Sequence, residues 1–281
     1  MRVAVFISGE PRFCTDFDQL MSSFKNYSSI DYFFFLWNKS PNNFSDKRWN
    51  LVADSWRNID IEWARNKIKQ NINGHNHNFV DLEIGDIDTE LEKIPNVGKH
   101  PPETNVRNVW LMHTAWSRVN SLKNKKQVND NFKYDIVING RLDITIDPLD
   151  LELVHKKLSD NDPCIMMVHA PLYGYVKIKY RRYINGKVKP KTVWVESKKP
   201  KLKTNDQFTI GLEPIMNTFM TVGQHSLEYS NQGLLFHPET ILVHHLSQNS
   251  IQILRHDFGL KLRNGWKEGD PFYTSNFAHW A

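Results

Sequence analysis

Short runs of continuously apolar residues alternate along the chain with segments in which apolar residues recur at helical spacing. Residues 3–7, 31–37 and 164–168 are mostly apolar at successive positions, as in strands that are covered on both faces. Residues 17–24, 56–72 and 103–122 instead carry apolar side chains three and four positions apart, which predicts helices. The alternation predicts an α/β fold with a mostly parallel central sheet flanked by helices.

The second half of the chain adds a hairpin and further strands and helices to this pattern. Asn185 and Gly186 form a dipeptide typical of tight β-turns, so residues 174–195 are expected to form a two-stranded excursion. Short strands are expected at residues 79–84, 206–210 and 251–254, and helices at 213–228 and 238–248. The Pro and Gly residues of segment 86–102 predict irregular structure there.

The size of the chain is sufficient for one large domain with a full hydrophobic core. It has 281 residues, of which 40% are hydrophobic. We expect a single domain that spans residues 1–281, with a hairpin insert at about 174–203 and an irregular tail at 263–281.

Positive charge is concentrated in one segment. Residues 177–203 contain eleven Lys and Arg against one acid, Glu196, so this segment carries +10 while the net charge of the whole chain is only +5. The rest of the chain is therefore acidic, at −5. A protein that binds nucleic acid through a global basic field is not expected to have this distribution.

Targeting signals and cysteine usage favour a cytoplasmic location. No charged segment precedes the first apolar run, and no apolar run approaches the ~20 residues of a membrane span. The cysteines, Cys14 and Cys164, lie far apart and form no metal-binding pair, which suits a reducing compartment. Both are interpreted as small buried residues.

The segment 134–143 carries the clearest chemical signal. Its apolar strand, which includes Val137 and Ile138, leads directly into Arg141 and Asp143. In open α/β sheets the carboxyl ends of the strands are where ligands bind. Asp143 is thus placed to hold a divalent cation, although an Asp at this spacing can also cap a turn or pair with Arg141.

Three separated segments, taken in order, resemble one group of enzymes. They are residues 3–12 (VAVFISGEPR) with 31–37 (DYFFFLW), residues 134–143 (YDIVINGRLD) and residues 205–211 (NDQFTIG). Together they are similar to glycosyltransferases of the GT-A fold in bacteria, phages and large viruses. The resemblance covers about residues 2–255. Glu10 departs from the usual Gln, and Asn139 stands where a first Arg is more common.

The resemblance implies a GT-A-like sheet, a nucleotide-sugar donor and a glycan or glycoconjugate acceptor. It also implies that Asp143 corresponds to the metal-binding carboxylate of the family's Asp-x-Asp signature, with Mn²⁺ or Mg²⁺ as cofactor. Arg141 replaces the first acid of that signature, and its guanidinium could pair with the diphosphate. For a viral protein, the cytoplasm would be that of the host.

Further site residues are expected in the loops that follow the strands. Arg12 is placed to bind a phosphate, although it can equally be a solvated loop charge. Ser8 and Gly9 allow close approach of the backbone to a nucleotide. Asp206 could deprotonate or position an acceptor hydroxyl, with Gln207 as a hydrogen-bonding partner of the donor sugar. A turn cap is the alternative role for Asp206.

The histidines and the basic hairpin leave alternatives open. His75 and His77 are interpreted as solvated loop residues, whereas His244, His245 or His256 could supply a third metal ligand, as a C-terminal His does in several GT-A enzymes. The hairpin segment could guide an anionic acceptor or, with its interleaved aromatic residues, bind single-stranded nucleic acid. A transferase-derived protein that only binds nucleotide or glycan is the other alternative. The sequence predicts no oligomeric state.

Overall fold

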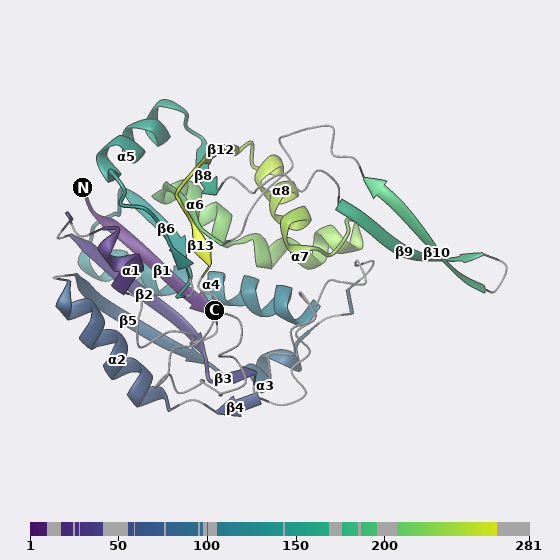
Figure 1. Cartoon of the computed structure of the whole chain (residues 1–281), viewed down its shortest axis with the longest axis horizontal. Coiled ribbons are helices and arrows are strands. Elements are labelled where there is room, and N and C mark those ends of the chain that lie inside the picture. Colours follow the sequence, from purple (N-terminus) through teal and green to yellow (C-terminus); the bar gives the residue numbers. More distant parts are fainter. Residues whose placement is uncertain are drawn as a thin grey trace.

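A seven-stranded mixed sheet forms the centre of the protein (Figure 1). The structure is a computed structural model. It describes residues 1–9, 18–24, 26–27, 29–41, 56–58, 60–75, 77–94, 96–97, 100, 106–142, 144–168, 176–184, 187–195 and 207–262. The strand order is β5-β2-β1-β6-β11-β8-β12. Each neighbouring pair is parallel except those that involve β11, which runs antiparallel to both β6 and β8.

The five inner strands of this sheet are largely buried, whereas the edge strands β5 and β12 are partly exposed. The bounds of the strands are β1 Val3–Gly9, β2 Ile30–Trp37, β5 Asn78–Gly85, β6 Ile136–Gly140, β8 Cys164–Val168, β11 Thr209–Leu212 and β12 Gln252–His256. Three smaller two-stranded sheets consist of β3 Lys39–Pro41 with β4 Trp56–Asn58, β7 Ile144–Thr145 with β13 Lys261–Leu262, and β9 Val176–Ile184 with β10 Lys187–Val195.

Helices cover both faces of the sheet. On one face lie α1 Asp18–Ser22, α2 Ile61–Gly74 and α5 Leu151–Asp160, whose apolar residues pack on Val5, Phe34 and Ile138. On the other lie α4 Val106–Asp130, α6 Glu213–Met220, α7 Val222–Asn231 and α8 Pro238–Gln248, with α3 Ile87–Leu91 beside them. The predicted α/β class, with a mostly parallel sheet flanked by helices, is confirmed.

Several elements begin or end elsewhere than the apolar pattern predicted. The helix expected from residue 56 begins at Ile61, because Asp60 caps it by accepting a hydrogen bond from the Trp63 N–H at 2.9 Å. The helix expected at 103–122 extends to Asp130. The helix expected at 213–228 is divided into α6 and α7, and α3 occupies part of the segment expected to be irregular.

The pairing of the hairpin strands and the burial of Cys164 follow the predictions. β9 and β10 pair antiparallel as expected, and their ribbon projects from the body of the protein (Figure 1). Residues 185 and 186 of its turn lie outside the described residues. Cys164 is a free, buried cysteine as predicted, and burial raises the pKa of its thiol to about 11. Cys14 lies outside the described residues.

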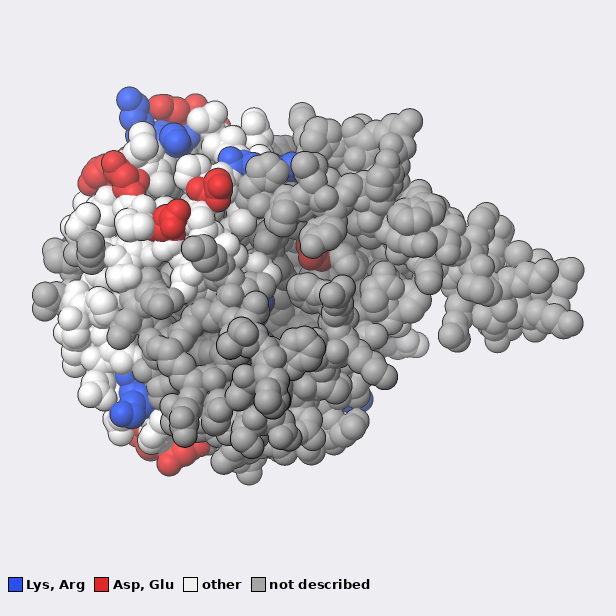
Figure 2. Space-filling view, viewed as in Figure 1, with Lys and Arg blue, Asp and Glu red and all other residues white. Residues whose placement is uncertain are grey.

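The described surface carries charges of both signs. On the face seen in Figure 2, its acidic and basic side chains form small mixed groups. Within the part of the chain that the structure describes, no helix combines the length and the apolar character that a membrane span requires.

Candidate functional site

The spatial order of the strands reverses at β1. The chain proceeds from β1 outward to β2 and β5, and then returns to the opposite side of β1 as β6. In open α/β sheets, ligands bind outside the carboxyl ends of the strands at such a switch point. The carboxyl ends of β1 and β6 are therefore the position in this fold where a ligand is expected.

Register places the first two sequence motifs together at this position. In the parallel pair β1–β6, Ile7 lies opposite Gly140. Continuing the register by one residue places Ser8 level with Arg141. Both residues are half-buried. Residues separated by more than a hundred positions in the sequence thus reach the same edge of the sheet.

The third motif reaches the same edge from the other side of β6. Thr209 lies opposite Asn139 in the antiparallel pair β6–β11, so two residues further out Gln207 lies level with Arg141. Gln207 is also half-buried. We refer to these polar residues as the carboxyl-edge cluster, which consists of Ser8, Asn139, Arg141, Gln207 and Thr209.

Two members of the carboxyl-edge cluster each have a buried side-chain oxygen atom without a hydrogen-bond partner among the described residues. Asn139 is 1% exposed and Thr209 is 0% exposed, and neither Asn139 Oδ1 nor Thr209 Oγ1 has a hydrogen-bond partner in the described part of the chain. Leaving such an atom unsatisfied costs about 1–3 kcal/mol. Both residues are in register with apolar residues of the face that packs on α4 and α6, Phe6 and Met167. A polar ligand at this edge would provide the missing partners.

The sequence did not assign a role to Asn139 or Thr209. The available signal was a polar residue within each of two otherwise apolar strands. Only the strand register, which places the two residues opposite each other, identifies them as a pair.

Gly9 has a backbone conformation that depends on its lack of a side chain. It ends β1 with φ at +115°, a conformation that residues with a side chain rarely adopt. No heavy atom lies within 4 Å of the position that a Cβ atom would occupy. β1 therefore ends in a turn conformation that favours glycine. That this turn brings the backbone close to a nucleotide stays a prediction.

The charged residues predicted for this site mostly lie outside the described residues. These are Arg12, Asp143 and Asp206. Among the residues that the structure describes, no three His, Cys, Asp or Glu side chains are grouped to hold a metal ion. Asn139 Oδ1 and Thr209 Oγ1 are neutral oxygen atoms of the type that Mn²⁺ or Mg²⁺ accepts, and the predicted carboxylate ligand, Asp143, lies outside the described residues.

The structure separates the three C-terminal histidines that were candidates for a metal ligand. Both ring nitrogens of His245 are engaged, since Nε2 lies 2.8 Å from the Thr218 carbonyl oxygen and Nδ1 lies 2.9 Å from Tyr229 Oη. His245 is therefore a structural residue between helices. His244 packs edge-on against Tyr229. Only His256 lies at the carboxyl end of a sheet strand, β12.

The interpretation of His77 as a solvated residue is wrong. Its side chain is 4% exposed and its ring stacks on Tyr32 with 5.5 Å between ring centroids. Burial lowers the pKa of His77, which favours its neutral form. The Asn- and Gly-rich neighbourhood suggested a surface loop, but the ring fills space beside β2.

Comparisons with known proteins find similarity only at the level of solved structures. No protein-family model and no curated protein matches the sequence. A nucleoside-diphosphate-sugar pyrophosphorylase from Vibrio cholerae is 11% identical, with a TM-score of 0.45 over 94% of this chain and 95% of that chain. Mouse xyloside xylosyltransferase 1 is 7% identical, with a TM-score of 0.41 over 90% of this chain and 84% of that chain. Neither similarity is close enough to assign an activity.

Proposed function

We propose that the protein is a glycosyltransferase that moves a sugar from a nucleotide-diphosphate sugar to a glycan or glycoconjugate acceptor, assisted by Mn²⁺ or Mg²⁺. The observation that supports this proposal is the carboxyl-edge cluster. In this cluster, residues from all three segments of the predicted transferase pattern lie at the switch point of the sheet, beside two buried oxygen atoms that have no partner among the described residues.

The proposed residues divide the chemistry between them. In the transfer, the bond between the anomeric carbon and the diphosphate oxygen breaks, a bond to an acceptor oxygen forms, and the acceptor hydroxyl loses its proton. Arg141 and Arg12 would neutralise the diphosphate. Asp206 would accept the proton or position the acceptor, and Gln207 would hydrogen-bond the donor sugar. A metal ion held by Asp143 would add positive charge at the leaving diphosphate.

The hairpin suggests an anionic acceptor. Each of its strands has nine residues, so it extends about 30 Å. Its strands belong to the +10 segment at residues 177–203 and project away from the sheet (Figure 1). An acidic glycan or a phosphorylated head group would be attracted to such a projection. Single-stranded nucleic acid is the competing partner, and it predicts steeply salt-dependent binding to oligonucleotides.

A thermal-shift panel tests the proposed function. We expect at least one of the uridine, guanosine, cytidine or thymidine diphosphate sugars to raise the melting temperature, with a larger shift when Mn²⁺ is present, because a ligand stabilises the state that binds it. The absence of a shift with every donor would contradict the transferase proposal. A donor-dependent shift without transfer to any acceptor would favour an inactive binding protein, and stabilisation by oligonucleotides alone would favour the nucleic-acid alternative.

Substitution of Asp143→Asn tests the proposed metal ligand. We expect this variant to lose the Mn²⁺-dependent part of donor binding while it keeps the fold, because the neutral amide is a much weaker ligand than the carboxylate. Asp147→Asn is the matched control. The Asp147 N–H donates a hydrogen bond to the Phe258 carbonyl at 2.8 Å, a backbone contact that the substitution keeps. Mn²⁺-dependent binding that persists in Asp143→Asn would exclude Asp143 as the ligand.

A further inference from the structure

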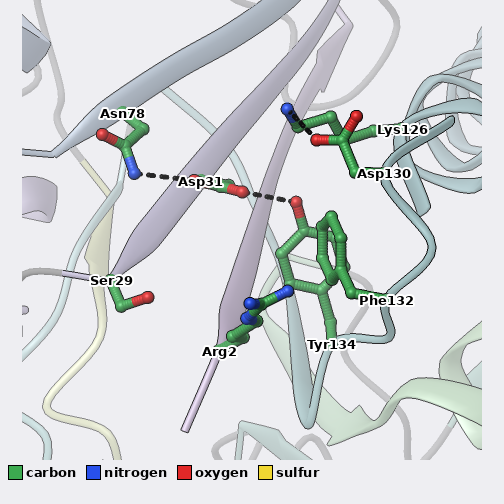
Figure 3. A pocket seen from close by; sticks show the side chains of 8 residues that line it. All are labelled: Arg2, Ser29, Asp31, Asn78, Lys126, Asp130, Phe132 and Tyr134. Atoms are coloured by element: carbon green, nitrogen blue, oxygen red, sulfur yellow. Dashed lines mark hydrogen bonds and ion pairs between the residues drawn. The ribbon is translucent and has the colours of Figure 1, made fainter.

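A second site candidate lies at the opposite, amino-terminal edge of the same sheet. A cavity of about 380 Å³ opens there, between the beginnings of β1, β2 and β5 and the last turn of α4 (Figure 3). Its volume lies near the lower end of the about 300–1,000 Å³ that is typical of small-molecule sites. β1, with seven residues, separates it from the carboxyl-edge cluster by about 20 Å. A single sugar residue in this cavity cannot reach the proposed transfer site.

A carboxylate held in a fixed orientation forms one wall of the cavity. Asp31 accepts a hydrogen bond from Tyr134 Oη at 2.5 Å and another from Asn78 Nδ2 at 2.8 Å (Figure 3). Tyr134 is 3% exposed, and burial raises the pKa of its hydroxyl so that it remains a donor. Since a carboxylate offers about four lone-pair positions, Asp31 retains about two for a ligand.

Hydrogen-bond donors form the other wall. The Arg2 guanidinium lies 4.4 Å from the centroid of the Phe132 ring, whereas the hydrogen bond from Arg2 to Asp135 Oδ2, at 2.6 Å, comes from its backbone N–H. The guanidinium has five N–H donors, which a ligand in the cavity could use. Lys126 Nζ lies 2.5 Å from Asp130 Oδ2, and both side chains are partly exposed. The ammonium has three donors, so this single contact leaves further protons for a ligand.

The charges that line the cavity balance. Two cations, Arg2 and Lys126, face two carboxylates, Asp31 and Asp130. A cavity with no net charge gives little advantage to an anion or a cation, but it offers donors and acceptors side by side. Neighbouring hydroxyl groups of a sugar match this pattern, because each hydroxyl can donate to a carboxylate and accept from a cation. Phe132, which is partly exposed beside the buried Tyr134, adds a small apolar edge to a lining that is otherwise polar.

We propose that this amino-edge cavity binds a neutral sugar residue and serves as a carbohydrate-binding site separate from the proposed transfer site. It would hold part of a glycan without taking part in chemistry. The proposal rests on the lining residues alone and does not depend on the transferase assignment.

Titration of the isotope-labelled full-length protein with neutral sugars tests this site. The probes are glucose, galactose, mannose, xylose and N-acetylglucosamine, together with their common disaccharides, and the readout is the amide resonances of Phe132 and Tyr134. We expect at least one sugar to shift both resonances in a saturable manner. Asp31→Ala should weaken this binding about tenfold or more, because it removes charge-assisted hydrogen bonds. Tyr134→Phe should weaken it less, since it removes only the group that orients Asp31.

A matched control and two contrary outcomes complete the test. Lys69 lies 5.2 Å from the centroid of the Phe79 ring, a cation–aromatic contact outside this cavity, so Lys69→Ala should leave sugar binding unchanged. The proposal is overturned if no sugar shifts the two resonances, or if glycine or betaine shifts them and sugars do not. Asp31→Ala should keep the thermal shift produced by a nucleotide-sugar donor, which separates failure of this site from failure of the proposed function.

Discussion

Replacement of Lys123 by Met is expected to lower the free energy of unfolding by about 3–5 kcal/mol. Lys123 lies on α4 with a side chain that is 0% exposed, and its ammonium forms an ion pair with the Glu213 carboxylate, which is 8% exposed. Without the ammonium, this carboxylate remains buried without a counter-charge. The loss would be a large part of the about 5–15 kcal/mol by which a folded protein is stable.

The contacts around this ion pair explain why the loss would be large. Lys123 Nζ also donates to Asn217 Oδ1 at 2.7 Å, and Asn217 Nδ2 donates to Glu213 Oε1 at 2.6 Å. The three side chains therefore form a closed network that joins α4 to the first turn of α6. Burial lowers the pKa of Lys123, although its contacts with Glu213 oppose this effect. The network thus keeps both charges in the interior.

Urea denaturation of three variants checks this prediction. Lys126→Met is the matched control on the same helix, because Lys126 pairs with Asp130 at a partly exposed site; its loss should cost less than about 1 kcal/mol. The double variant Lys123→Met/Glu213→Leu should recover most of the lost stability, since apolar residues often replace a buried ion pair at little cost. A single Lys123→Met variant that stays within about 1 kcal/mol of the native protein would contradict the argument.

The same buried polar residues explain where the sequence predicted α4 incorrectly. The apolar stripe that predicts this helix ends at residue 122, but the buried face continues through Lys123 and Gln127. A prediction based only on apolar positions ends the helix too early when the buried positions of its last turns are polar. In contrast, α5 carries ordinary helix signals in the sequence. Asp150 caps it, and Leu151, Val154 and Leu158 form its buried stripe.

The sequence predicted strands better than it predicted their arrangement. Continuous apolar runs identified β1, β2 and β8 because each is covered by helices on both faces. The antiparallel direction of β11 could not be predicted from its own four residues, since those residues do not determine which strands it pairs with. The sequence indicated that Arg141 and Gln207 belong to one site. It could not indicate that Asn139 and Thr209 lie opposite each other, because this depends on the pairing of β6 with β11.

A buried histidine is expected to make the protein less stable in mild acid. His113 on α4 is 1% exposed, and neither ring nitrogen has a hydrogen-bond partner among the described residues. Burial, and to a lesser degree the neighbouring His245, lower the pKa of His113 from 6.5 to about 3. The surroundings offer no carboxylate partner in the described residues. The nearby Tyr229 and His245 side chains are hydrogen-bonded to each other rather than to His113. On the α7 side, Gly223 packs against the His113 backbone and offers no side chain.

The direction of the pH effect follows from proton binding. Between pH 6.5 and pH 3 the unfolded chain binds a proton at His113 that the folded protein does not bind, so acid favours unfolding. The contribution of neutral His113 to stability is complete above pH 6.5 and is lost progressively as the pH falls toward 3. At pH 5 the loss amounts to about 2 kcal/mol. Burial also lowers the pKa of His77 and His245, which adds to the effect in the same direction.

Substitution of His113→Leu separates this contribution from the others. Leucine has no group to protonate and leaves no polar atom unsatisfied in the contact between α4 and α7, so stability at pH 8 should be unchanged or higher. The difference in unfolding free energy between pH 8 and pH 5, measured by urea denaturation, should become smaller by about 2 kcal/mol than in the native protein. An equal pH dependence in both proteins would mean that His113 gains its proton in the folded state, and that the interior around α4 admits charge more readily than its burial indicates.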